Sequence, residues 1–357
     1  MKTIIVTGAV SLLLALFCTP LLIRLLRYYG YGQPIRIEGL RTAEIKRGTP
    51  TMGGVVMMLA SVIGYIVGHV ATDDPATASG VLVLLAMLGL GVVGFVDDFL
   101  KIFRQNSVGL RSKAKLAGQI VVGVIFGVEV LQHPDTFALT PADAHLSFLR
   151  DFGPAIGTLP FVIWVVILMA GTSNAVNLTD GLDGLATGST IVVLSAYVLI
   201  GIWQERNACF PAPAPQCYQV RDGLDLAVVA AAVLGACLGF LWWNAPPARI
   251  IMGDTGALAL GGVLAGLAVC TKTALLLVIL GGLFVIVTFS VIIQVSVFKV
   301  TRRRTGKGFR VFKIAPLHNH FEMVGWADTT IVMRFWLISG LCVALGLGIF
   351  YAEWLRI

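Results

Sequence analysis

Carboxylate and amide side chains are crowded, with glycines between them, into one short stretch of the chain, NAVNLTDGLDGLATG. Apolar runs suited to lipid flank it on both sides, and polar residues beside membrane spans are expensive and usually functional. If the stretch is helical, residues three apart share a face, which pairs Asn174 with Asn177 and Asp180 with Asp183. The glycines allow the backbone to approach a ligand closely. The stretch therefore predicts a binding site rather than a plain connection.

Two more acidic motifs lie at the ends of predicted apolar helices. Asp97 and Asp98 close one helix in GFVDDFLKI, where the two carboxylates repel each other and meet the unfavourable end of the helix dipole. Asp254 in MGDTG is expected at the N-cap of another helix, and a helix N-terminus can receive phosphate. Hard oxygen donors suit Mg²⁺, which typically takes one or two carboxylates plus substrate phosphates. The motifs predict metal-assisted phosphate chemistry, although a solvated helix end and a simple cap would also explain them.

Two histidines bracket Asn319 in the motif PLHNHFE. Pro316 favours extended backbone, in which alternate residues face the same way, so His318 and His320 are expected to point together. Two histidines near basic residues suit phosphate contact or proton handling. The letters HNH also mark a class of nuclease, but no zinc-binding or ββα context surrounds them here.

The elements that must position these residues are membrane helices. Of the 357 residues, 57% are hydrophobic and 13% are charged, whereas a soluble domain has about 25% charged residues. A spanning helix needs about 20 mostly apolar residues. The sequence predicts an all-α polytopic membrane protein in which residues 1–357 form a single integral-membrane domain. The ten expected spans are 4–26, 52–70, 80–98, 116–131, 157–173, 185–203, 225–243, 252–270, 274–298 and 332–353.

The loops between these spans share the basic residues unevenly. Eighteen of the 26 lysines and arginines lie in the loops of one side, and the same loops hold the polar motifs. The positive-inside rule places that side in the cytoplasm and both termini outside, so the active site is expected at the cytoplasmic face. Topology thus accounts for the net charge of +7, and nucleic acid is not an expected partner.

The six cysteines divide into two groups. Four lie in the predicted spans, where they are expected to be small packing residues. Cys209 and Cys217 flank FPAPAPQ in a predicted exterior loop, and they can form a disulfide if that side is oxidising.

Five motifs in this order, GTPTMGG, GFVDDFLKI, NAVNLTDGLDGLATG, MGDTG and PLHNHFE, resemble the polyprenyl-phosphate N-acetylhexosamine-1-phosphate transferases. PTMGG and PLHNHFE are similar to the phospho-N-acetylmuramoyl-pentapeptide transferase branch of that family. The resemblance covers nearly the whole chain. It implies Mg²⁺-dependent transfer of phospho-MurNAc-pentapeptide from UDP-MurNAc-pentapeptide to undecaprenyl phosphate, giving lipid I and UMP for peptidoglycan synthesis. It also implies a homodimer in the cytoplasmic (inner) membrane of a bacterium.

The resemblance assigns roles to individual residues. Asp254 is the leading Mg²⁺ ligand, with Asn177 beside it as a second. Asp97 is the base or nucleophile near the lipid phosphate, with Asp98 next to it, and His318 or His320 contacts phosphate or the pentapeptide sugar. Both a one-step attack and a covalent aspartyl-phosphate route remain open. The implied substrate-binding residues are Lys46, Thr51, Lys115, Asn174, Asn177, Asp180, Gly181, Leu182, Asp183, Asn244, Ile251 and Asn319, with Lys101 and Lys113 as secondary candidates.

Three positions depart from the family's usual pattern. The family usually has three consecutive histidines where this chain has Asn319 in the middle, so that residue cannot act as an acid or base. It usually has an aromatic residue, stacked on uracil, where this chain has Ile251, which offers no π-face. A Ser-His pair is often found before the lysine at position 46, and RTAEIK lacks it.

Two other functions remain as alternatives. A sister transferase that uses UDP-GlcNAc would share the aspartates but differ in the fifth loop, and APLHNHFE favours the muramoyl enzyme. A secondary transporter would hold its carboxylates near the bilayer centre in broken helices, often with repeated halves. Here the acids cluster at predicted helix ends and no halves repeat.

Overall fold

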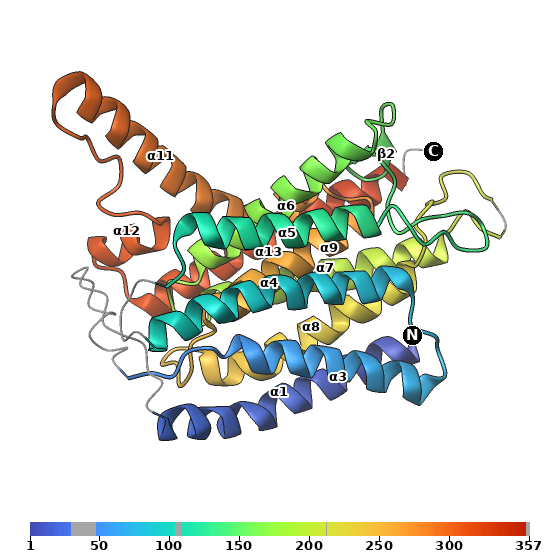
Figure 1. Cartoon of the computed structure of the whole chain (residues 1–357), viewed down its shortest axis with the longest axis horizontal. Coiled ribbons are helices and arrows are strands. Elements are labelled where there is room, and N and C mark those ends of the chain that lie inside the picture. Colours follow the sequence, from blue (N-terminus) through green and yellow to red (C-terminus); the bar gives the residue numbers. More distant parts are fainter. Residues whose placement is uncertain (30–47, 104–108, 212, 355–357) are drawn as a thin grey trace.

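The computed structural model describes residues 1–29, 48–103, 109–211 and 213–354 (Figure 1). The regular elements are all helices apart from one two-stranded antiparallel hairpin, which confirms the predicted all-α class. The elements are α1 (Lys2–Tyr28), α3 (Gly54–Thr72), α4 (Ala78–Phe103), α5 (Ser112–Glu129), β1 (Leu146–Ser147), β2 (Asp151–Phe152), α6 (Thr158–Thr179), α7 (Leu185–Arg206), α8 (Gly223–Asn244), α9 (Gly253–Cys270), α10 (Leu277–Leu280), α11 (Gly282–Thr305), α12 (Leu317–Val324) and α13 (Asp328–Trp354).

Nine helices within the described ranges are long and apolar enough to cross a membrane. The remaining one of the ten expected spans, residues 116–131, corresponds to α5, which is a helix but does not meet that standard. Lys113 and Lys115 lie in its first turn and Glu129 ends it, so its apolar stretch is shorter than the roughly 20 residues that a span requires.

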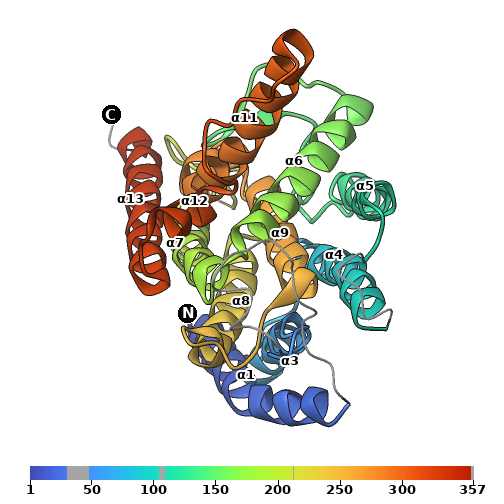
Figure 2. The same ribbon diagram turned by 90° about the vertical axis from the view of Figure 1, so that its left-hand side faces the viewer.

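Helix α9 forms the centre of the bundle. Figure 2 shows it enclosed by neighbours, and every residue from Thr255 to Cys270 is buried. Its sequence, GDTGALALGGVLAGLAVC, is rich in glycine and alanine, which let helix backbones approach closely where no aqueous hydrophobic effect drives association. A Cβ at Gly261 would lie 2.3 Å from Cα of Ser173 on α6. The small residues of α9 therefore allow its neighbours to close around it.

Helix α1 also packs closely on α8 because small residues lie at the contact. A Cβ added at Gly235 would lie 2.2 Å from the carbonyl oxygen of Gly8, and one added at Gly239 would lie 2.3 Å from that of Leu12. Glycines four residues apart on α8 thus provide a smooth strip against which the α1 backbone rests.

Helices α11 and α12 bring the fifth polar motif back to the bundle. Figure 1 shows α11 leaning away from the other helices and the chain then returning through α12 to the end where α4 finishes. We call this the acidic end, because it carries Asp97, Asp98 and Asp254. At the opposite end Cys209 and Cys217 form a disulfide, which confirms the pairing that the sequence left open.

We expect Gly235→Ala to destabilise the protein by about 1–3 kcal/mol, because the new methyl group would press on backbone that cannot move aside. The measurement is the thermal unfolding midpoint in detergent micelles. Gly348→Ala on α13 is the matched control, since nothing lies within 4 Å of its added Cβ. Equal midpoints for the two variants would contradict the close α1–α8 contact.

Candidate active site

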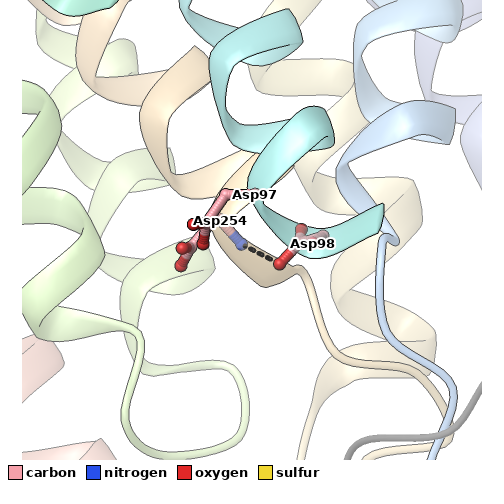
Figure 3. A group of neighbouring side chains, drawn as sticks. All are labelled: Asp97, Asp98 and Asp254. Carbon is pink, nitrogen blue, oxygen red and sulfur yellow. Dashed lines mark hydrogen bonds between the residues drawn. The ribbon is translucent and has the colours of Figure 1, made fainter. Parts of the chain in front are cut away.

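Three carboxylates meet at the acidic end. Asp97 and Asp98 lie in α4 and Asp254 in the first turn of α9, and one oxygen from each falls within 4.8 Å of the others (Figure 3). Asp97 and Asp98 are each 3% exposed. Buried carboxylates require compensating charge or hydrogen bonds, so their partners decide what the cluster can do.

Two ammonium groups supply the compensating charge. The Lys101 Nζ lies 2.6 Å from Oδ2 of Asp97 and 2.8 Å from Oδ2 of Asp254. Lys115 on α5 places its Nζ 2.8 Å from the same Asp254 oxygen. Three carboxylates against two ammonium groups leave a surplus of negative charge among hard oxygen donors. The residues present therefore fit a hard divalent cation.

Asp98 caps the helix that carries Asp254. Its Oδ2 accepts hydrogen bonds from the backbone N–H of Thr255 at 2.9 Å and from its hydroxyl at 2.7 Å. Its Oδ1 accepts one from the backbone N–H of Asp254 at 3.2 Å, the bond drawn in Figure 3. A carboxylate from α4 thus satisfies donors that the first turn of α9 cannot satisfy itself.

This arrangement corrects the expectation that Asp254 is the N-cap. The helix begins two residues earlier than expected, at Gly253, and its N-cap residue Met252 makes no side-chain capping bond. Because Asp98 provides the cap from another helix, the Asp254 carboxylate is left to meet Lys101 and Lys115.

A cavity of about 180 Å³ opens beside the carboxylates. All the expected polar motifs that the structure describes contribute to its wall. Ten of the predicted site residues line it: Thr51, Asp98, Asn177, Asp180, Gly181, Ile251, Asp254, His318, Asn319 and the secondary candidate Lys101.

Asn174 and Asn177 have different surroundings, although both lie in the last two turns of α6. Asn177 donates from Nδ2 to Oδ1 of Asp254 at 3.0 Å and lines the cavity. Asn174 donates to Oε1 of Gln119 on α5 at 3.1 Å and does not line it. The two asparagines thus tie α6 to α9 and to α5.

Three more of the expected substrate-binding residues do not line the cavity and have structural contacts instead. Leu182 is 2% exposed and belongs to an apolar cluster with neighbouring helices. Asp183 accepts a hydrogen bond from the backbone N–H of Ala248 at 2.9 Å. Asn244 donates to the carbonyl oxygen of Ile250 at 3.0 Å and so anchors the connection before α9.

The two histidines do not point together, so the expectation of an extended segment is wrong. Residues 317–324 form helix α12, with Pro316 as its N-cap, a place where the missing proline N–H costs nothing. Residues two apart on a helix face nearly opposite ways. His318 is buried and lines the cavity, whereas the His320 ring packs on Phe312 and Phe321.

Gly181 meets His318 rather than an open space. A Cβ at residue 181 would lie 2.0 Å from Nε2 of His318, so only glycine allows the imidazole to come this close. The close approach expected for a ligand is made by a side chain of the protein, and it joins the third motif to the fifth.

The sequence indicated Lys101 only as a secondary substrate-binding candidate, and it did not indicate the contacts of Thr255 with Asp98 or of Gln119 with Asn174. Lys101 follows Asp97 by four residues, and this spacing would have shown the pair had the helix been expected to continue to Phe103. Asp97 itself does not line the cavity, because Lys101 and the backbone N–H of Leu110 cover its carboxylate.

Lys46, another of the expected substrate-binding residues, lies outside the described residues.

Known proteins match this chain along its full length. Residues 80–272 match glycosyl transferase family 4, and residues 46–56 match the phospho-N-acetylmuramoyl-pentapeptide-transferase signature 1. The phospho-N-acetylmuramoyl-pentapeptide-transferase of Thermobifida fusca is 56% identical over 355 residues, which covers 99% of each chain. Proteins of the same name from Kineococcus radiotolerans and Saccharopolyspora erythraea are 57% and 51% identical, over 99% and 100% of this chain and 99% of each relative.

The matched regions cover almost the whole chain, including the helices, the acidic cluster and the segments that line the cavity. The chain therefore belongs to the phospho-N-acetylmuramoyl-pentapeptide transferase family.

Proposed function

We propose that this protein transfers phospho-MurNAc-pentapeptide from UDP-MurNAc-pentapeptide to undecaprenyl phosphate, releasing UMP and forming lipid I. The observation that carries the proposal is the cavity. All five motifs contribute to its walls, and they bring the carboxylates of Asp98 and Asp254 together with the ammonium of Lys101. Its position at one end of a bundle of membrane helices suits a reaction between a soluble nucleotide and a lipid.

The setting of the reaction is part of the same proposal. We place the enzyme in the cytoplasmic membrane of a bacterium, with the acidic end facing the cytoplasm and the whole chain acting as one domain. The homodimer implied by the family resemblance is kept as a prediction.

The cation of the proposed site is Mg²⁺, held by Asp254 with Asn177 beside it. Oxygen donors and the surplus negative charge of the cluster support this choice over a softer metal. When bound, Mg²⁺ would neutralise phosphate charge and polarise phosphoryl oxygens.

The protein's own groups provide positioning and charge. Phosphoryl transfer brings two anionic substrates together, so positive charge and orientation dominate its catalysis. Lys101 and Lys115 are the proposed phosphate contacts, because both ammonium groups stand at the Asp254 carboxylate. Asp97, 2.6 Å from Lys101, is the proposed base for the lipid phosphate, and Asp98 is proposed as a positioning residue.

The proposed substrate contacts follow the walls of the cavity. Ile251 and Gly181 offer apolar and backbone surface near Asp254 for the nucleoside, with Asp180 beside them. His318 and Asn319 also line the cavity, which supports their assignment to the phosphate or sugar side. Thr51 completes the lining from the segment before α3.

The choice of donor tests the proposed function directly. With undecaprenyl phosphate and Mg²⁺, we expect UMP release from UDP-MurNAc-pentapeptide to exceed that from UDP-GlcNAc by about 100-fold or more, because a site that bonds a substrate's polar groups rejects donors that lack them. The measurement is kcat/KM for UMP release with each donor. A reversed preference would instead establish the sister UDP-GlcNAc transferase.

Replacement of the proposed metal ligand gives a second test. Asp254→Asn should lower kcat by about 100-fold to 1000-fold and shift the Mg²⁺ titration to higher concentrations, because a carboxylate charge at the reacting centre is lost. Asp73→Asn, an exposed carboxylate outside the cluster, is the matched control and should leave both values unchanged. Full activity in Asp254→Asn at ordinary Mg²⁺ would refute the assignment.

A double-mutant cycle tests the positioning role of Asp98. Thr255→Val removes one of its hydrogen bonds and should lower kcat about tenfold, whereas Thr255→Ser should keep near-normal activity. Asp98→Asn should lose more, and the double variant should lose less than the product of the two effects, because both changes break one contact. If Thr255→Val were silent while Asp98→Asn was inactive, Asp98 would act on substrate instead of through α9.

A further inference from the structure

A second pocket lies at the acidic end, outside the catalytic cavity. It has a volume of about 280 Å³ and is lined by α1, the last turn of α8 and the connection that follows α8. Its lining residues are Pro20, Ile23, Arg24, Arg27, Trp243 and Arg249. The four from α1 are spaced three, four and seven residues from Pro20, so they share one face of the helix.

The ring of Trp243 forms the floor of this pocket, and Pro20 is the reason that it is held in place. Pro20 lies inside α1 and has no N–H, so the carbonyl of Leu16 lacks its usual helical donor. The indole Nε1–H of Trp243 takes that place and donates to the Leu16 oxygen at 2.9 Å. The defect in α1 thus locks the tryptophan ring of α8 against it.

Arg249 is positioned on this floor. Its guanidinium carbon lies 5.5 Å from the centre of the Trp243 ring, and its backbone N–H donates to the carbonyl oxygen of Trp243 at 2.8 Å. Arginine on an aromatic face is favoured electrostatically and remains free to present its other donors to a ligand.

The described residues that line the pocket carry three positive charges and include no acid. Among the described residues, no carboxylate forms an ion pair with Arg24, Arg27 or Arg249. Guanidinium groups match phosphate oxygens in pairs of parallel hydrogen bonds and stay charged at every physiological pH. A cluster of this kind is suited to a phosphate group that arrives from outside the protein.

The surroundings indicate that the phosphate belongs to a lipid. Tyr28 is 83% exposed and Trp242 is 76% exposed at the same end, as expected of aromatic residues at a membrane interface. Next to Arg24, the outer surface of α1 presents Leu13, Phe17 and Leu21, each at least half exposed and four residues apart. Acyl chains can lie along these side chains while the headgroup enters the pocket.

We propose that this pocket binds the phosphate headgroup of an anionic membrane phospholipid. The site is separate from the catalytic cavity, but its Arg249 lies two residues from Ile251, which lines that cavity. The backbone of Ile251 is paired with Pro50 and Gly53, so a bound headgroup would brace the connection that forms one catalytic wall.

The test is retention of lipid by the full-length protein in a neutral detergent, measured by native mass spectrometry with phosphatidylglycerol or phosphatidylcholine added. The test variant is Arg24→Gln/Arg27→Gln/Arg249→Gln. The matched control is Arg302→Gln/Arg303→Gln/Arg304→Gln, which removes the same charge from the end of α11, well separated from α1 in Figures 1 and 2. Trp243→Phe is a second variant that keeps an aromatic ring, although a smaller one, and loses the bond to Leu16.

The wild-type protein should retain phosphatidylglycerol in clear preference to phosphatidylcholine. The pocket variant should lose that retention about tenfold or more, Trp243→Phe about twofold to fivefold, and the α11 control less than twofold. Equal losses in the pocket variant and the control would show diffuse attraction and overturn the proposal. Displacement of the lipid by millimolar inorganic phosphate, together with equal retention of the two lipids, would identify a soluble phosphate ligand and also overturn it.

Discussion

The bond between Asp98 and the first turn of α9 is the contact on which the site depends. It joins two helices that lie about 150 residues apart in sequence, and it is formed by a carboxylate that is almost fully buried. A buried charge without partners would be costly, but Asp98 receives two backbone donors and a hydroxyl. The same donors would otherwise remain unsatisfied at the start of α9. The contact therefore compensates the buried charge of Asp98 and satisfies the free N–H groups of α9 at the same time.

With the helix end held in this way, Asp254 becomes the point at which four helices meet. Lys101 reaches it from α4, Lys115 from α5 and Asn177 from α6. Each of these contacts is a charge-assisted hydrogen bond, the strong class in a poorly hydrated interior. The cluster therefore performs two tasks, since it ties the helices together at one end and assembles charge for phosphate chemistry there.

Close approach of backbones is the second condition of the fold. A Cβ at Gly94 would lie 2.2 Å from the carbonyl oxygen of Asp254, and one at Gly253 would lie 2.5 Å from Oδ2 of Asp98. Larger residues at either position would push α4 away from α9 and lengthen the capping bonds. Membrane helices pack through such small residues because lipid offers no hydrophobic drive for association, and here the same packing sets the geometry of the polar cluster.

The sequence by itself determined the class of fold, the approximate spans and the motifs that meet at the site. These follow from apolar segment length and from the cost of polar groups near lipid, which are local properties of the chain. The five ordered motifs also identified the family correctly, and the cysteine pair that could form a disulfide does so.

Only the tertiary structure decided which atoms of those motifs share the cavity. Asp98 took over the capping role that was expected of Asp254, because the cap of α9 comes from another helix and no local pattern can show that. His318 and His320 separated because residues 317–324 are helical, and Asn244 and Asp183 became supports because both bond to the connection between α8 and α9. Residue types reveal which chemistry is available, whereas the direction of each side chain depends on contacts between segments that the sequence does not place relative to one another.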